Sequence, residues 1–438
     1  MKIPHLRWYI AGLLFTATVI NYINRQTMSI VAPVLTKELH VTPIAYSEIV
    51  QAFLIAYTVM YLGSGFLVDR WGTRNSLAIF MAWWSLANMA HALARSVLGL
   101  GICRFLLGVG EPGNFMAALK ATSEWYPSKE KGFVTGLVNA GASVGAIVAA
   151  PLVVWITLQH GWRASFVVTG TFGFVWMAAW LWLYRTPETH PHITPAELAY
   201  IREDSGAVTA QARISTLDLL RMRQTWGLLL ARFVSDPVWW FYLFWLPKYL
   251  FDQRGFTLVQ VGMFAWVPYL CADFGAVAGG LVSGYLIPRS TSVLRARLKT
   301  MLPCALVMPL SILIAVTPSA TLAVALICLV TCSHMAWKTA LMTMTNDFYP
   351  KHVVGSVSGI IAFGSGLGGT LFTSLTGFIV QHFSYTWIFV VMGFLHPIAY
   401  ILARSLVCGR ISPATPVVPQ PQLGVFSAGG GRNGAAAG

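Results

Sequence analysis

Seven charged residues interrupt stretches of this sequence that are otherwise almost entirely apolar. They are Arg25, Arg104, Glu111, Arg232, Asp236, Asp273 and Lys338. A charge at the centre of a membrane-spanning helix costs about 2.5–3.5 kcal/mol on insertion scales, so each one needs a partner or a polar cavity. Charges in such surroundings indicate a functional site by default.

Two of these stretches carry groups that can bind an anion and a proton. Arg25 lies in the segment 22–27, and its planar guanidinium can hold a carboxylate by two parallel hydrogen bonds. Arg104 and Glu111 share one helix face about two turns apart. Glu111 precedes Pro112, which can open the helix locally. Burial favours a neutral carboxyl and a nearby arginine favours a charged one, so Glu111 can load and release a proton. The alternatives are static pairs of Glu111 with Arg104 or with Arg25.

Other polar residues also fall on helical faces within apolar stretches. His334, Trp337 and Lys338 share one face through their spacing of three and four residues. Asn139 and Ser143 are four residues apart beside a Gly-x-x-x-Gly motif that permits close helix approach. The polar pair reaches a central cavity or packs in the core; the sequence leaves both open.

A third set of charges is expected to be structural or to act in gating. Arg232 and Asp236 are four residues apart on one helix and are expected to pair, and Asp273 is a candidate to join them. The chain lacks a Walker-type glycine loop, closed Cys/His metal spacing and a Gly-x-Ser-x-Gly elbow. ATP-driven transport, a resident metal and serine hydrolase chemistry are therefore not predicted.

The composition requires a membrane around these charges. Of 438 residues, 56% are apolar and 10% are Asp, Glu, Lys or Arg, whereas soluble domains carry about 25% charged residues. The net charge is +14, but the basic residues form short clusters between apolar runs instead of a patch with interleaved aromatics. Nucleic-acid binding is therefore not predicted. The six cysteines lie in or beside apolar runs and are expected to be core residues.

Twelve apolar runs are long enough, or nearly so, to span a bilayer. They cover about 8–30, 46–68, 75–94, 97–119, 132–157, 164–184, 226–250, 260–287, 300–317, 320–344, 355–380 and 385–407. We therefore predict an all-α integral membrane protein with twelve transmembrane helices. The predicted parts are a six-helix bundle (1–190), a cytoplasmic central loop (191–225), a second six-helix bundle (226–408) and a disordered cytoplasmic tail (409–438).

The basic residues predict the orientation, and short repeats predict a duplication. With the N-terminus inside, the inner loops and both ends hold 20 of the 29 Lys and Arg, and the outer loops hold 5, which places both termini in the cytoplasm. Three matches relate the two halves at offsets of 219, 223 and 223: 65–70 with 284–289, 124–127 with 347–350, and 166–170 with 389–393. Parallel repeats of six helices place a binding site near the midplane between the bundles.

The sequence resembles the major facilitator superfamily. The segment Gly65-x-x-x-Asp69-Arg70-x-Gly72-x-Arg74 looks like that superfamily's signature between helices 2 and 3. The resemblance implies that Asp69, Arg70 and Arg74 form a latch that closes the inner side. A weaker counterpart is expected at Pro288 and Arg289, where proline replaces the acid.

A narrower resemblance covers nearly the whole chain apart from its tail. The sequence is similar to the anion:cation symporters, and within them to bacterial hexuronate transporters. The matching stretches are Leu6-Arg-Trp-Tyr9, Lys120-Ala-Thr-Ser-Glu-Trp-Tyr-Pro127, Ala149-Ala-Pro-Leu-Val-Val-Trp155, Arg232-Phe-Val-Ser-Asp-Pro237, Met263-Phe-Ala-Trp266 and Ala272-Asp-Phe-Gly275.

The resemblance implies roles for the polar residues. Arg25 would bind the substrate carboxylate, and Glu111, next to Arg104, would carry the proton. The remaining expected substrate contacts are Tyr22, Tyr57, Trp337, Asn139, His334 and Lys338. One departure is Asn24, because many members of the family have an acidic residue just before the arginine, and asparagine cannot titrate.

These expectations describe a secondary transporter and not an enzyme. It would import a sugar acid, most readily a hexuronate, with a proton as the coupling ion and no cofactor. It would work as a monomer in the bacterial inner membrane, in contact with lipid. The alternative is a uniporter or exchanger of other organic anions such as aldonates or small carboxylates, which Asn24 permits. A polytopic membrane enzyme or sensor is disfavoured because a nucleophile set, a metal set or a signalling domain is missing from the sequence.

Overall fold

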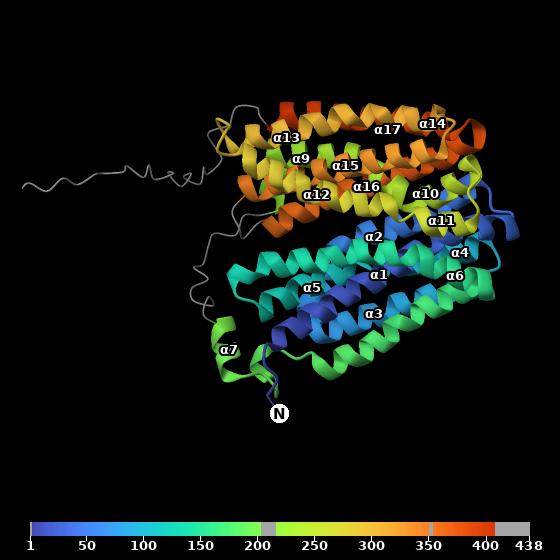
Figure 1. Ribbon diagram of the computed structural model, residues 1–438. Coiled ribbons are helices and arrows are strands. Elements are labelled where there is room, and N and C mark those ends of the chain that lie inside the picture. The colour runs from blue at the N-terminus through green and yellow to red at the C-terminus, as the bar shows by residue number, and fades with distance from the viewer. Residues whose placement is uncertain (1, 203–215, 350–353, 408–438) are drawn as a thin grey trace, which may run out of the picture. The chain divides into compact units, whose positions relative to one another are not determined.

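The structure is a computed structural model that describes residues 2–202, 216–349 and 354–407, and all regular secondary structure in these ranges is helical (Figure 1). The N-terminal half contains α1 (Leu6–Glu38), α2 (Pro43–Trp71), α3 (Thr73–Ala90), α4 (Val97–Gly110), α5 (Pro112–Trp125) and α6 (Ser128–Leu183). Two short helices, α7 (Pro195–Arg202) and α8 (Thr216–Arg221), follow. The C-terminal half contains α9 (Arg223–Ser235), α10 (Pro237–Arg254), α11 (Leu258–Phe264), α12 (Val267–Leu286), α13 (Val293–Val307), α14 (Ser311–Val316), α15 (Ala320–Phe348), α16 (Val354–His382) and α17 (Tyr385–Val407).

Each predicted apolar run falls on one helix or on consecutive helices. The runs 132–157 and 164–184 both lie on α6, which bends at Gly161, where φ is 80°. By length and composition, eight helical segments of the described residues are long and apolar enough to cross a membrane. Helices α4, α5 and α9 are each too short to cross a membrane alone. The break between α4 and α5 falls at Pro112, and the break between α9 and α10 falls at Pro237. The all-helical membrane fold is thus confirmed, while the number of twelve spans stays a prediction. The predicted tail 409–438 lies outside the described residues.

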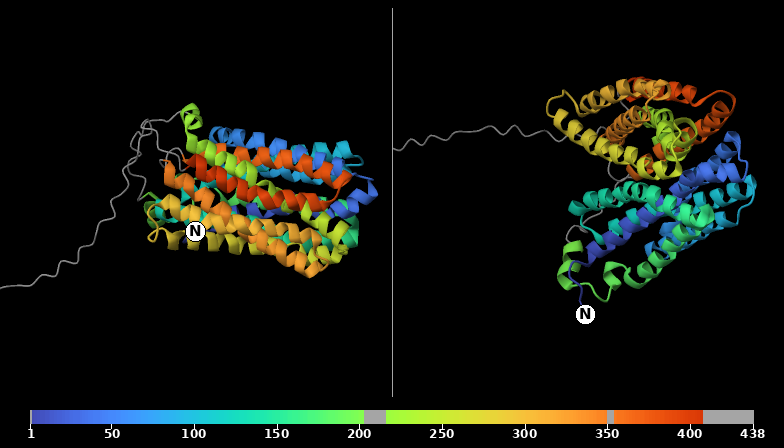
Figure 2. Two further views of the ribbon diagram at one scale, coloured as in Figure 1. Left: turned by 90° about the horizontal axis from the view of Figure 1, so that it is seen from above. Right: turned by 45° about the vertical axis from the view of Figure 1, so that its right-hand side comes forward.

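Helices of each half pack mainly on one another (Figure 2). In the N-terminal half α1 runs along α6, α2 along α4, and α3 along α6. In the C-terminal half α12 runs along α15, and α9 packs against α16 and α17. Between the halves the main contacts are α2 with α16, α1 with α10 and α6 with α11.

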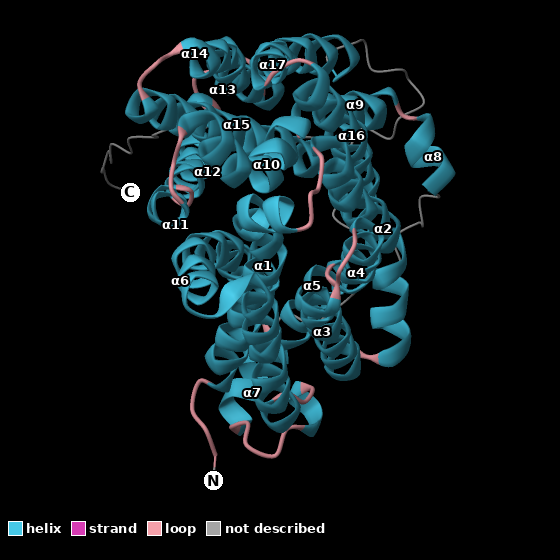
Figure 3. Ribbon diagram, turned by 90° about the vertical axis from the view of Figure 1, so that its right-hand side faces the viewer, coloured by secondary structure: helices cyan, strands magenta, loops and turns pink. Residues whose placement is uncertain are grey.

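Two hydrogen bonds join the halves at the end of the molecule that holds the α1–α2 connection, which faces the viewer in Figure 3. The Tyr46 hydroxyl donates to the Phe244 carbonyl oxygen at 2.7 Å, and the Ile44 N–H donates to the Gln381 side chain at 3.2 Å. The opposite end carries the start of α1, α7 and the start of α9. There, no hydrogen bond, ion pair or ring contact among the described residues joins the halves.

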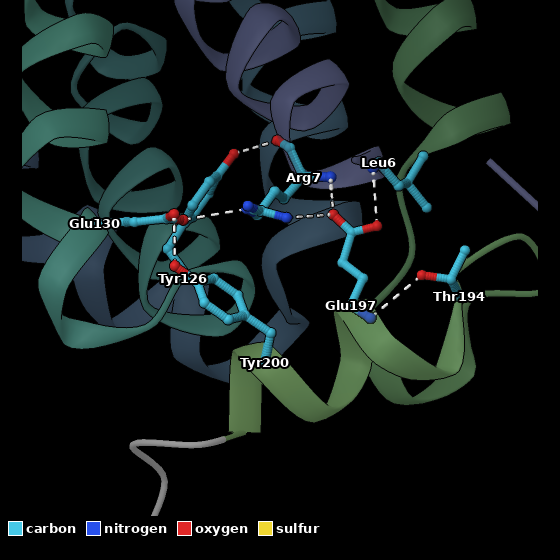
Figure 4. A network of polar contacts seen from close by, with 7 residues as sticks. All are labelled: Leu6, Arg7, Tyr126, Glu130, Thr194, Glu197 and Tyr200. Carbon is cyan, nitrogen blue, oxygen red and sulfur yellow. Dashed lines mark hydrogen bonds and ion pairs between the residues drawn. The ribbon is translucent and has the colours of Figure 1, made fainter. Parts of the chain in front are cut away.

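A carboxylate of α7 holds the start of α1 (Figure 4). Glu197 is buried and accepts hydrogen bonds from the backbone N–H groups of Leu6 at 3.0 Å and Arg7 at 3.1 Å. Its Oε1 also pairs with the Arg7 guanidinium at 3.0 Å. Glu130 on α6 pairs with Arg7 at 3.1 Å and accepts from the Tyr200 hydroxyl at 2.9 Å. A negative charge at a helix N-terminus is favourable, so α7 ties α1 to α6.

Close approach of α1 and α6 depends on the predicted glycine motif. A Cβ on Gly141 would lie 2.6 Å from the Phe15 carbonyl oxygen, and one on Gly145 would lie 2.5 Å from that of Val19. The same Cβ on Gly145 would lie 2.8 Å from Cβ of Tyr22. The motif therefore permits backbone contact, as expected, and fixes the position of Tyr22.

We expect Glu197→Gln to lower the stability of the detergent-purified protein, because Gln removes the charge that faces the first N–H groups of α1. A partly buried charge at a helix terminus contributes up to about 2 kcal/mol, which thermal unfolding can detect. The control is Glu188→Gln, whose carboxylate is about half exposed and lies 4.0 Å from Arg202. Equal loss of stability in both variants would contradict the capping role of Glu197.

We expect Gly145→Ala to destabilise the protein by about 1–3 kcal/mol, the usual range for overpacking, because the new methyl group would meet backbone of α1. Gly136 lies on the same helix, and a Cβ there would meet nothing within 4 Å. Gly136→Ala is therefore the matched control and should be neutral or slightly stabilising in the same thermal measurement. A neutral Gly145→Ala would show that the two helices are not in backbone contact.

Candidate functional site

Arg25 of α1 and Glu111 form a buried ion pair between α1 and the α4–α5 junction. The Nε and one terminal nitrogen of Arg25 lie 2.7 Å and 2.6 Å from the same oxygen, Oε2 of Glu111. The two side chains are 2% and 0% exposed. The other carboxylate oxygen, Oε1, is buried and has no partner among the described residues. Of the two partners that the sequence allowed for Glu111, Arg104 and Arg25, the structure shows Arg25.

Aromatic rings surround the Arg25 guanidinium. Its central carbon lies 4.6 Å from the Tyr22 ring centre, 4.7 Å from that of Tyr57 and 5.5 Å from that of Phe53. Ring faces attract a cation, and more strongly where water is excluded. The structure therefore brings Arg25, Glu111, Tyr22 and Tyr57 together, as the sequence predicted. Phe53 was missed, because a phenylalanine in an apolar run gives no signal of its own.

Arg104 does not pair with Glu111, so that alternative was wrong. One of its terminal nitrogens donates to the Arg25 carbonyl oxygen at 3.1 Å, and its guanidinium lies 5.4 Å from the Phe53 ring centre. Its other two nitrogens are buried without a partner among the described residues. Seven residues separate Arg104 from Glu111 by about 10 Å along the helix, and Arg25 occupies the position next to Glu111. We call Arg25, Arg104 and Glu111 the N-terminal charge cluster.

The sequence suggested that the helix can open at Pro112. In the structure it does not open widely there. Glu111 keeps helical angles, φ −63° and ψ −38°, and only the hydrogen-bond ladder is interrupted. The Asn114 N–H still bonds to the Glu111 carbonyl oxygen at 3.2 Å, and the Asn21 side chain approaches the same oxygen at 3.4 Å.

Several buried polar atoms around the cluster lack partners within the described ranges. They belong to Asn24, Gln26, Arg104, Glu111 and Asn114. An unsatisfied buried polar group costs about 1–3 kcal/mol, so the free atoms of Arg104 and Glu111 are candidates to bind a substrate. Gln26 and Asn114 were missed by the sequence analysis, although amides inside apolar runs would have been a usable signal.

A second cluster of polar residues lies in the C-terminal half. Arg232 bonds through two nitrogens to Oδ2 of Asp236, at 2.8 Å and 2.5 Å, and Oδ1 has no partner in the described part of the chain. The predicted pairing is confirmed, whereas the gating role stays a prediction. Lys338 lies close enough to act electrostatically on Asp236. We call Arg232, Asp236 and Lys338 the C-terminal charge cluster.

The other candidates on α15, His334 and Trp337, lie beside the C-terminal charge cluster and not at Arg25. His334 lies parallel to the Trp239 ring, with centres 5.9 Å apart, and its Nδ1 is 3.0 Å from Nε2 of His396. Trp337 is fully buried and donates from Nε1 to Oγ of Ser235 at 3.2 Å. The roles of His334, Trp337 and Lys338 in substrate contact stay predictions.

Asp273 does not join Arg232 and Asp236. Its Oδ1 instead accepts a hydrogen bond of 2.5 Å from Oγ of Ser143, which connects α12 to α6 and so links the two halves. The earlier expectation failed because sequence spacing does not report contacts between distant helices. Asn139, one turn before Ser143, is exposed.

The latch residues make contacts within the N-terminal half. Asp69 pairs with Lys120 at 2.9 Å, and Arg70 is exposed. Arg74 donates from Nε to the Tyr184 carbonyl oxygen at 2.9 Å and so caps the end of α6. Their gating role stays a prediction. Among the described residues no group of three His, Cys, Asp or Glu side chains is placed to hold a metal.

The chain matches the Major Facilitator Superfamily over residues 14–373. It is 34% identical to a hexuronate transporter of Escherichia coli K12, covering 90% of this chain and 92% of that one. It is 38% identical to a galacturonate transporter of Dickeya chrysanthemi over 64% of this chain and 82% of that one.

Solved structures support the fold. A bacterial homologue of the human lysosomal transporter Spinster, in an inward-facing and occupied conformation, matches with a TM-score of 0.77 at 17% identity, covering 94% of this chain and all of that one. A D-xylose–proton symporter matches with a TM-score of 0.72 at 14% identity, covering 91% and 97%. The chain therefore belongs to the Major Facilitator Superfamily, and it is an integral membrane transporter and not an enzyme.

Proposed function

We propose that this transporter imports a hexuronate together with a proton across the bacterial inner membrane. The curated relatives that carry sugar acids support the substrate class, and the buried Arg25–Glu111 pair supports the coupling. No cofactor takes part, and the monomer is the working unit. Twelve spans in two bundles of six place both termini in the cytoplasm.

The pair of Arg25 with Glu111 is the observation that carries this proposal. A substrate carboxylate needs the same two guanidinium donors that Glu111 holds. Removing one partner from a buried ion pair costs about 3–5 kcal/mol, so Arg25 is released only when another anion takes the place of Glu111. A proton added to the free Oε1 neutralises Glu111 and weakens its hold on Arg25. Proton and anion therefore bind together.

Tyr22 and Tyr57 lie where they can contact the sugar. Both rings face Arg25, so a carboxylate on the guanidinium brings the adjoining pyranose against them. Their hydroxyls can hydrogen-bond to sugar hydroxyls. Further proposed substrate contacts are Trp337, His334 and Lys338 on α15 of the C-terminal half, and Asn139 on α6.

Access would alternate by rocking of the two halves. With both termini in the cytoplasm, the contact of Tyr46 with Phe244 lies on the outer side, and the Ser143–Asp273 hydrogen bond joins the halves further inside. These contacts support an inward-facing state. They break when the outer side opens. The latch residues Asp69, Arg70 and Arg74 then close the inner side, with the Arg232–Asp236 pair taking part in gating.

Asn24 favours a second candidate function. Its amide is fully buried, and neither of its polar atoms has a partner within the described ranges. Without an acid at this position, coupling rests on Glu111 in this half, and an exchanger or uniporter of aldonates or other carboxylates is the alternative. Relatives 30% identical carry the description of probable galactarate/D-glucarate transporters, and one 27% identical is a D-galactonate transporter.

Uptake of labelled D-glucuronate into proteoliposomes tests the proposal. We expect accumulation only with an inward proton gradient. Accumulation that does not depend on the proton gradient would contradict symport. Absence of uptake would contradict the assignment of D-glucuronate as a substrate. Competition by D-galactonate and D-glucarate then separates hexuronates from the alternative anions.

We expect Glu111→Gln to retain exchange of D-glucuronate while losing its accumulation. Gln cannot titrate, but it leaves Arg25 free to bind a carboxylate. The measurements are counterflow and gradient-driven uptake in proteoliposomes. Glu48→Gln is the control, because Glu48 is exposed at the end of the molecule that holds the α1–α2 connection. Loss of both activities in Glu111→Gln, with the control normal, would indicate a purely structural ion pair.

A further inference from the structure

Two histidines face each other in the interior of the C-terminal half. His334 of α15 and His396 of α17 are 1% and 0% exposed. Nδ1 of His334 and Nε2 of His396 lie 3.0 Å apart, which is a hydrogen-bond distance. The two outer nitrogens, Nε2 of His334 and Nδ1 of His396, are buried and have no partner among the described residues.

This geometry lets the pair bind one proton without breaking its internal hydrogen bond. When both rings are neutral, one facing nitrogen donates its hydrogen and the other accepts it. One outer nitrogen then carries a hydrogen, and the other has a free lone pair. A proton adds to that lone pair, and the product is an imidazole–imidazolium pair with the same N–H···N bond.

The charges around the pair connect proton binding to anion binding. The groups that act on it are Asp236 at the α9–α10 junction, Arg232 of α9 and Lys338 of α15. Tyr400 of α17 lies beyond Trp337, with ring centres 6.4 Å apart. Two cations and one carboxylate leave a net charge of +1 beside the neutral pair, and a bound proton raises it to +2. In a dry interior that is unfavourable, so the proton is held best when an anionic substrate is also present.

Two tryptophan rings pack against the pair. The Trp239 ring is parallel to His334, and the Trp337 ring meets His396 edge-on with centres 5.3 Å apart. The face of an indole ring favours an imidazolium over a neutral imidazole. The ring beside His334 can thus stabilise a cation on the pair.

We propose that the His334–His396 pair is a second proton-binding site, which loads with the substrate and takes the place of the acid that is missing at Asn24. This inference rests on the proposed proton-coupled transport of a sugar acid. The proton comes from water on the outer side, forms an N–H bond on an outer ring nitrogen, and leaves to water on the cytoplasmic side with substrate release.

The variants that test this can keep the interhelical hydrogen bond, and each replaces one imidazole of the pair by an amide that does not take up a proton. His334→Asn places an amide group near the position of Nδ1, and His396→Gln places one near that of Nε2. The control is His91→Gln in the other half, a buried histidine whose Nδ1 lies 2.9 Å from the Ala87 carbonyl oxygen. Fluorescence-detected size-exclusion chromatography verifies that each variant folds, and the second variant serves where the first fails.

Histidine NMR with nitrogen-15 labelling, on the purified protein in nanodiscs without substrate, tests the pair independently of any transport. We expect His334 and His396, assigned by the two variants, to titrate together and to take up about one proton between them. Two independent titrations, or no titration of either ring before the protein unfolds, would overturn the proposal.

The ratio of protons to D-glucuronate, obtained from reversal potentials in proteoliposomes, tests the coupling. We expect the ratio to fall by about one in either histidine variant and to stay unchanged in His91→Gln. Coupled transport with an unchanged ratio in His396→Gln overturns the inference and leaves the proposed function intact. If the native protein carries no D-glucuronate, the proposed function fails, and the NMR titration alone decides on the histidine pair.

Discussion

A charged side chain in the membrane interior needs an opposite charge or a polar partner, and this constraint organises both halves of the transporter. The N-terminal and the C-terminal charge clusters each contain two cations and one carboxylate. In both, a guanidinium bonds through two nitrogens to a single carboxylate oxygen, so the second oxygen is left over. Each half therefore has an excess positive charge that an anionic substrate can balance.

The backbone places the two carboxylates in the same local setting. Glu111 and Asp236 each come directly before a proline, and both keep helical angles. Proline has no N–H, so one carbonyl of the preceding turn loses its helical partner. The carboxylate thus lies at a point where the ladder is already interrupted, in the middle of two short helices that are stacked end to end.

The sequence predicted the helices well. It predicted the charges and the pair within one helix, but it left the partner of Glu111 open. Apolar runs determine where helices form, and rare charges inside them stand out, so Arg25 and Glu111 were found. Spacing on one helix correctly paired Arg232 with Asp236, because those residues share a face. It cannot say which residue of another helix faces Glu111, since helix rotation and crossing decide that. For this reason Arg104 was considered as a partner, the Ser143–Asp273 contact was not foreseen and His396 was missed.

The charges of the N-terminal charge cluster explain how a single carboxylate, Glu111, can couple the binding of a proton to the binding of the substrate anion. The cluster carries +1 with Glu111 ionised. A proton alone would raise it to +2 and leave Arg25 without a counter-ion, which a dry interior strongly disfavours. An anion alone would find the Arg25 donors already held by Glu111. When both bind, the cluster returns to +1 and every donor of the original pair has an acceptor. In the empty and in the doubly loaded site Arg25 is paired with one anion and no second carboxylate competes for its donors, and these are the two states proposed to change access.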